Sequence, residues 1–81
     1  MVRVQFFGQV RGIAGGKETE VADCPDVGSL FSLLSERFGN QLRPESLIVM
    51  VNGRHIAHTG FLGTPLVPGD LVSIFPVIGG G

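Results

Sequence analysis

Apolar and polar side chains alternate at the start of the chain, which is the period of a β-strand with one face on a core. Val2, Val4 and Phe6 share the apolar face. An irregular stretch containing several glycines follows, and the alternation returns over residues 17–22. We therefore expect two strands joined in an antiparallel hairpin by a long loop.

A helical pattern covers residues 27–38. Its apolar residues recur at spacings of three and four, which places them on one side of a helix. Asp26 suits the N-cap position, and Gly39 suits the left-handed position that ends a helix. The apolar stripe consists of Val27, Leu30, Phe31, Leu34 and Phe38.

The second half of the chain contains three further strand patterns. Residues 47–51 form a continuous apolar run, which predicts a central strand covered on both faces. Asn52 and Gly53 are a strong hairpin signal because both accept positive φ, so residues 54–57 should return as a short strand. After a stretch broken by proline and glycine, residues 70–75 supply the last strand.

The element order β, β, α, β, β, β predicts an α+β fold with a mixed five-stranded sheet packed on one main helix. A first and last strand lying parallel at the centre of the sheet would suit a right-handed crossover. We expect residues 1–76 to form the domain and residues 77–81 to form a flexible glycine tail.

Length and charge narrow the range of functions. The 81 residues and 8.6 kDa fit one small domain. A net charge of −1 without a basic cluster argues against nucleic-acid binding. The longest apolar run is far shorter than the roughly 20 residues of a membrane span. No secretory signal opens the sequence, so we expect no membrane partner and a cytoplasmic protein.

The sequence offers little to a metal ion. A single cysteine, Cys24, excludes an intramolecular disulfide and a cluster held by four thiolates. His55 and His58 have no thiolate or carboxylate at ligand spacing, so we expect no metal site. Buried packing as a small side chain is a better prediction for Cys24 than a reactive thiol.

The chemistry is expected at the C-terminal glycines. Residues 77–81, if extended, reach roughly 17 Å, and Gly79, Gly80 and Gly81 carry no side chain to block entry into a partner's cleft. A partner enzyme using ATP would convert the Gly81 carboxylate into a mixed anhydride open to sulfur or amine attack. Catalysis would belong to partners, because the chain has no paired Ser and His and no phosphate-binding loop. The alternative is a disordered tail or cloning remnant.

Outward-facing aromatic residues form a candidate docking patch. Phe7 and Phe75 follow Phe6 and Ile74 in their strands and so point to the opposite face of the sheet. If Phe6 and Ile74 face the helix, Phe7 and Phe75 should lie outside beside the tail, or else fill a second minor core. Phe61, in a glycine-rich loop, is expected either to extend the patch or, as we favour, to plug the open end of the sheet. Arg11 and Arg54 would steer acidic partners or an adenylate phosphate, or else be simply solvated.

Four segments carry a family resemblance that runs from end to end. Residues 2–11 read VRVQFFGQVR, residues 47–52 read LIVMVN, residues 65–70 read PLVPGD and residues 72–81 read VSIFPVIGGG. The chain resembles the MoaD/ThiS family of β-grasp sulfur carriers. The FFGQVR segment and the FP-x-x-x-GG ending are similar to the molybdopterin synthase small-subunit branch of that family.

The resemblance implies a ubiquitin-like fold and a set of partners. A ubiquitin-activating-type adenylyltransferase would use ATP to adenylate Gly81, a sulfurtransferase would supply sulfur, and a thiocarboxylate would result. Gly80 and Gly81 would then enter the molybdopterin synthase large subunit. The chain itself would bind no cofactor. By position, Phe7, Arg11 and Phe75 match partner-contacting residues of that branch.

The same resemblance leaves several alternatives open. His55 falls where the family often has an apolar contact residue, and Val77, Ile78 and Gly79 depart from the usual FPPVAGG ending. The alternatives are a ubiquitin-like protein modifier, a carrier for thiamine, tRNA thiolation or cysteine synthesis, and an interaction module that binds through its aromatic patch without acyl chemistry.

Overall fold

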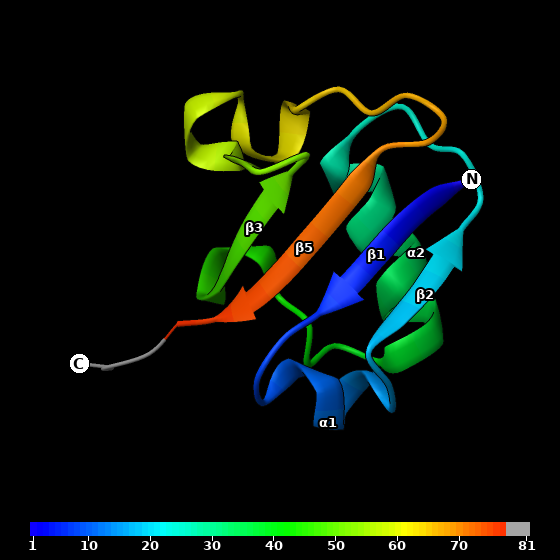
Figure 1. The fold of residues 1–81 in the computed structure, drawn as a ribbon, viewed down its shortest axis with the longest axis vertical. Helices are drawn as coiled ribbons and strands as arrows, with labels where there is room; N and C mark the ends of the chain where they lie inside the picture. Colours follow the sequence, from blue (N-terminus) through cyan, green and yellow to red (C-terminus); the bar gives the residue numbers. More distant parts are fainter. Residues whose placement is uncertain (78–81) are drawn as a thin grey trace.

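A computed structural model describes residues 1–77 as one sheet with a helix across one face (Figure 1). The five strands lie in the order β2-β1-β5-β3-β4. The helices and strands, in chain order, are β1 (Val2–Phe6), α1 (Val10–Ala14), β2 (Glu18–Val21), α2 (Val27–Phe38), β3 (Leu47–Val51), β4 (Arg54–His55) and β5 (Leu71–Pro76), with single 3-10 turns at Pro44–Ser46, Ile56–His58 and Phe61–Gly63.

The first and last strands lie side by side in the middle of the sheet. β1 and β5 pair in parallel with Phe6 opposite Ile74, while β1 pairs with β2 and β5 pairs with β3 in antiparallel fashion. The predicted mixed sheet and its parallel centre are therefore confirmed, and the arrangement is the ubiquitin-like β-grasp fold. The chain therefore leaves the sheet at the end of β5, a strand that is paired on both sides.

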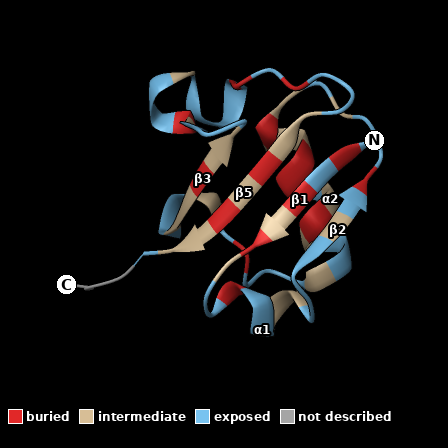
Figure 2. Cartoon of the chain, in the orientation of Figure 1, coloured by how far each residue is buried: buried red, intermediate tan, exposed pale blue. Residues whose placement is uncertain are grey.

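The core lies between the inner face of the sheet and α2. Buried and partly exposed residues alternate along β1 and β5 (Figure 2), because only one face of the sheet is covered. The rings of Phe6 and Phe38 meet edge to face with centroids 5.7 Å apart. The other buried contributors include Val2, Val4, Val27, Leu30, Leu34, Val49, Val72 and Ile74.

Helix α2 has the predicted bounds. The Asp26 carboxylate accepts a hydrogen bond from the Ser29 backbone N–H at 2.8 Å, and this bond lowers the pKa of Asp26. At the other end Gly39 has φ 79°, and its N–H donates to the carbonyl of Ser35. Both ends are thus fixed by local contacts that the sequence encodes.

The prediction of an irregular loop between the first two strands is wrong in one respect, because this segment contains helix α1. Gly8, at φ 57°, turns the chain out of β1, and Gly15, at φ 76°, ends the helix. Val10 is buried while Ile13 and Ala14 pack against the core. Their spacing of three and four is the helical signal that the glycines concealed.

Two details of the later strands also differ from expectation. β3 is not the central strand and is not covered on both faces, because α2 covers only the inner face, where Val49 is buried. The returning strand β4 is shorter than expected, since a 3-10 turn begins at Ile56. The predicted turn itself is confirmed, with φ 52° at Asn52 and 85° at Gly53.

Within residues 1–77, neither helix has both the length and the apolar character needed to cross a bilayer.

Candidate functional site

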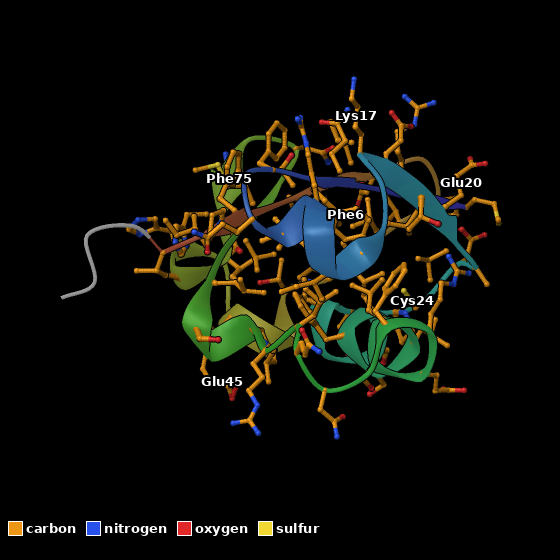
Figure 3. All side chains as sticks on the ribbon, turned by 90° about the horizontal axis from the view of Figure 1, so that it is seen from below. Phe6, Lys17, Glu20, Cys24, Glu45 and Phe75 are labelled. Carbon is orange, nitrogen blue, oxygen red and sulfur yellow. The ribbon has the colours of Figure 1, made fainter. Side chains whose placement is uncertain are left out.

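Two phenylalanines stack on the face of the sheet that α2 leaves open. The rings of Phe7 and Phe75 lie 4.4 Å apart between centroids, with 13° between their planes. Phe75 lies on the side of the sheet away from α2, whereas Phe6 points toward the helix (Figure 3). Both stacked residues remain partly exposed. The predicted outward pair therefore exists and offers aromatic surface to a partner.

Arg11 fixes one side of this stack. Its Nε donates a 2.8 Å hydrogen bond to the carbonyl of Phe6, and its guanidinium carbon lies 5.7 Å from the centroid of the Phe7 ring. The carbonyl anchor and the cation–π contact hold the charge over the aromatic face. We call Phe7, Phe75 and Arg11 the aromatic–arginine cluster. Helix α1, which the sequence did not predict, is the element that brings Arg11 there.

The cluster lies beside the point where the chain leaves the sheet. Phe75 precedes Pro76, the last residue of β5, and Val77 is exposed. Gly8 packs so closely on Pro76 that an added Cβ would lie 3.0 Å from the proline Cγ. The predicted site residues Gly79, Gly80 and Gly81 lie outside the described residues. The site is therefore described up to the exit of the tail.

Two residues that the sequence analysis missed extend this surface. Ile48 lies opposite Phe75 in the register of β3 and β5, and Met50 lies opposite Ser73. Residues opposite one another point to the same face, so both side chains lie outside the core. The signal was present in the apolar run itself, because a run with one buried face must expose every second side chain.

His55 lies on the same face but farther from the tail. It pairs with Met50, at the edge of the sheet, about two strand spacings or roughly 10 Å from β5. Its Nδ1 accepts a hydrogen bond from the Ala57 backbone N–H at 3.0 Å, and its ring meets His58 at 6.1 Å. His55 thus borders the open face without joining the aromatic–arginine cluster.

Phe61 lies at the opposite end of the molecule from the cluster. It occupies a turn at φ 53° and is 40% exposed, so it does not plug the sheet as expected. The neighbouring Leu62 carbonyl approaches Gly28 at the start of α2, whereas Phe38 at the end of α2 contacts Phe6. A helix of 12 residues separates these ends by about 18 Å. Phe61 therefore does not extend the patch.

The titratable side chains of residues 1–77 do not gather into a reaction centre. Burial raises the pKa of the Cys24 thiol, and the charges of Asp26 and Asp23 raise it further, so the reactive thiolate is disfavoured. Among residues 1–77 no three His, Cys, Asp or Glu side chains gather as metal ligands. Arg54 is exposed at the start of β4, away from the cluster. The arrangement suits docking of a partner beside the tail.

The sequence profile of the ThiS family matches residues 4–81. The chain is 36% identical over 85 residues to the molybdopterin synthase sulfur carrier subunit of Escherichia coli K12, covering 100% of both chains. It is 29% identical over 91 residues to small archaeal modifier protein 3 of Haloferax volcanii, covering 99% and 98% of the two chains.

A solved structure shares the whole fold. It is the complex of subunits 1 and 2 of the molybdopterin-converting factor from Helicobacter pylori 26695, in which a chain 28% identical to this one superposes with a TM-score of 0.70. The match covers 99% of this chain and 97% of that one. The resemblance drawn from the four sequence segments is thereby confirmed.

Proposed function

Because the chain belongs to the ThiS family, we propose that it is a sulfur carrier whose Gly81 carboxyl becomes a thiocarboxylate. The observation that carries this proposal is the position of the aromatic–arginine cluster. It lies where the central strand β5 ends, so a partner docked on the cluster also receives the tail. Because β5 is paired on both sides, the position of its end relative to the cluster is fixed, whichever partner binds.

The chemistry requires two activation steps on the same carboxyl. A ubiquitin-activating-type adenylyltransferase joins a Gly81 oxygen to the α-phosphate of ATP, and pyrophosphate leaves. Hydrosulfide, released by a thiol from the persulfide of a sulfurtransferase, attacks the acyl carbon and the bond to AMP breaks. The thioacid that forms at Gly81 loses its proton to water and becomes the thiocarboxylate, and no side chain among residues 1–77 has to act as acid or base. The chain binds no cofactor of its own, and ATP is used by the partner.

Sulfur is carried at the terminus rather than at the cysteine. Cys24 is only half exposed, and the raised pKa of its thiol keeps the protonated, poorly nucleophilic form. The Gly81 carboxyl, by contrast, follows a segment without side chains. The acyl route therefore suits this chain better than a persulfide route.

The acceptor that we propose is the molybdopterin synthase large subunit, which would pass the sulfur to a pterin precursor. The support comes from the E. coli relative, named as a sulfur carrier subunit of that synthase, and from the H. pylori complex of two converting-factor subunits. Phe7, Phe75 and the neighbouring Ile48 offer an apolar face of the kind that anchors such a subunit.

The second candidate is a protein modifier, since the H. volcanii relative carries that name. The same Gly81 adenylate would then react with a lysine of another protein. Carriage of sulfur to thiamine, tRNA or cysteine would use the same terminus with a different acceptor. An interaction module without acyl chemistry would need only the aromatic–arginine cluster.

Mass spectrometry separates these functions. The full chain is incubated with ATP, a sulfur source and the activating enzyme, and we expect the mass change of one oxygen-to-sulfur exchange at Gly81. A chain lacking Gly80 and Gly81 is the control, which should still bind the partners but carry no sulfur. An unchanged mass with active partners would refute sulfur carriage, and full function of the truncated chain would favour the interaction module.

A further inference from the structure

Lys17 is the only lysine among the 81 residues, and the other residues in the Lys and Arg total of 6 are arginines. A guanidinium stays protonated at any ordinary pH and does not accept acyl groups, whereas a lysine amine does so when it loses its proton. Lys17 is therefore the one side chain of this protein that can form a stable amide.

The fold places Lys17 toward the edge of the sheet at which β5 ends. The backbone carbonyl of Lys17 accepts a 2.7 Å hydrogen bond from the N–H of Phe6, and Phe6 lies opposite Ile74 of β5. Lys17 thus stands about two strand spacings, or roughly 10 Å, from Ile74, which lies two residues before the end of β5. Its side chain projects from the body of the protein (Figure 3) and has neither a hydrogen bond nor an ion pair within residues 1–77.

Lys17 also borders the aromatic–arginine cluster. A surface hollow of about 160 Å³ joins the two. It is lined by Gln5, Phe6, Phe7, Arg11, Lys17 and Glu18. Any group attached at Lys17 would consequently stand over the surface on which a partner docks.

The α-amino group of Met1 is a poorer acceptor. It lies 2.8 Å from Oδ1 of Asp23, and this hydrogen bond raises its pKa, so less of the amine is unprotonated. It also sits at the far end of β1, about 17 Å of strand away from the tail exit.

We propose that Lys17 is an acceptor site for the activated Gly81 carboxyl of a second copy of this chain. The inference rests on the proposed function, because it needs the same adenylate. The unprotonated Nζ attacks the acyl carbon, a C–N bond forms, the C–O bond to AMP breaks, and the amine proton passes to water. ATP, consumed by the adenylyltransferase, is the co-reactant.

The donor and the acceptor are separate copies because the two surfaces overlap. A copy docked on the activating enzyme through its cluster has its own Lys17 covered, whereas a free copy presents Lys17 openly. Once joined, the donor covers Phe7 and Arg11 of the acceptor. Conjugation and sulfur carriage therefore exclude each other, and sulfur shortage favours conjugation because the adenylate then waits for a nucleophile.

The first experiment omits the sulfur source. The full chain, ATP and the activating enzyme should give a covalent dimer whose mass is that of two chains less one water. Trypsin should release a branched peptide joining residues 12–37 of one copy to residues 55–81 of the other, because acylated Lys17 resists cleavage. Lys17→Arg keeps the charge, and it should lower the dimer yield at least tenfold while thiocarboxylate formation with sulfur stays at the wild-type level.

A second experiment removes the dependence on the enzyme. A Lys17→Arg donor carrying a Gly81 thioester, made by intein cleavage, is mixed with an acceptor that lacks Gly80 and Gly81. Dimer should form with Lys17 in the acceptor and fall at least tenfold with Lys17→Arg there. An equal yield from both acceptors, or a wild-type chain that closes on itself and loses one water as a monomer, would overturn the inference. Absence of the thiocarboxylate alone would count against the proposed function.

Discussion

Gly8 packs directly against the ring of Pro76, the residue at which β5 ends and the tail leaves the sheet. A Cβ on Gly8 would lie 3.0 Å from Cγ and 3.3 Å from Cδ of that proline, and Gly8 has φ 57°. The turn that leads into α1 therefore also supports the end of β5. A single position links the Arg11-bearing helix to the last residue of that strand.

Gly8→Ala should consequently impair both stability and activation of the tail. The left-handed conformation costs an alanine about 1–2 kcal/mol, and the contact with Pro76 adds to this cost. Gly15→Ala is the matched control, since Gly15 has φ 76° but nothing within 4 Å of an added Cβ. Urea unfolding should show the larger loss for Gly8→Ala. At a temperature where both variants are folded, only Gly8→Ala should slow Gly81 adenylation, and equal rates would contradict this role of the contact.

Phe75→Ala should weaken docking of the activating enzyme or of the synthase large subunit. Removing one ring breaks the stack with Phe7 and takes away an aromatic anchor, which we expect to lower affinity about tenfold, or about 1.4 kcal/mol. Phe61→Ala is the control, because it removes the same kind of side chain near the start of α2, far from the aromatic–arginine cluster. The affinity of this variant should stay within about twofold of wild type. Titration calorimetry measures both, and equal losses would refute the placement of the docking surface.

Helix α2 shows what local sequence can determine. Its cap at Asp26, its apolar stripe and Gly39 all act within one element, so the predicted bounds 27–38 agree with the structure. Helix α1 shows the opposite case. Five residues that include a glycine have little intrinsic helicity, and their helix depends on burying Val10 against the sheet, which is a tertiary effect.

In the candidate site, too, some residues could be placed from the local sequence pattern and others only from tertiary packing. Phe7 and Phe75 were predictable because alternation within a strand fixes which side chains face outward. The location of Phe61 was not, because it depends on how the turn at Gly60 and Phe61, both at positive φ, meets the start of α2. Arg11 reached the cluster through a helix that only packing creates.

The Asn52 side chain joins two strands, so its loss should destabilise the fold. Its Oδ1 accepts from the Leu71 N–H and its Nδ2 donates to Asp70, both at 2.9 Å. Asn52→Gly keeps the positive φ but loses both bonds, at about 1 kcal/mol per bond at most. Asn52→Ala loses the bonds and also strains the turn, so it should be less stable than Asn52→Gly by about 1 kcal/mol. Urea unfolding compares the two, and equal stabilities would mean that turn strain contributes nothing.

The cap of α2 should make stability depend on pH in the acid range. Hydrogen bonding to Ser29 lowers the pKa of Asp26 in the folded protein below its value in the unfolded chain. The stabilisation by the carboxylate is therefore complete above the unfolded value of about 3.9 and is lost as pH falls through the folded value. Asp26→Asn keeps a cap that does not titrate, so its free energy of unfolding should fall less than that of wild type between pH 7 and pH 3. Asp26→Ala should be the less stable variant at both pH values but share the shallower slope of Asp26→Asn. A slope as steep as that of wild type in both variants would show that other carboxyl groups, and not the helix cap, set the acid sensitivity of the fold.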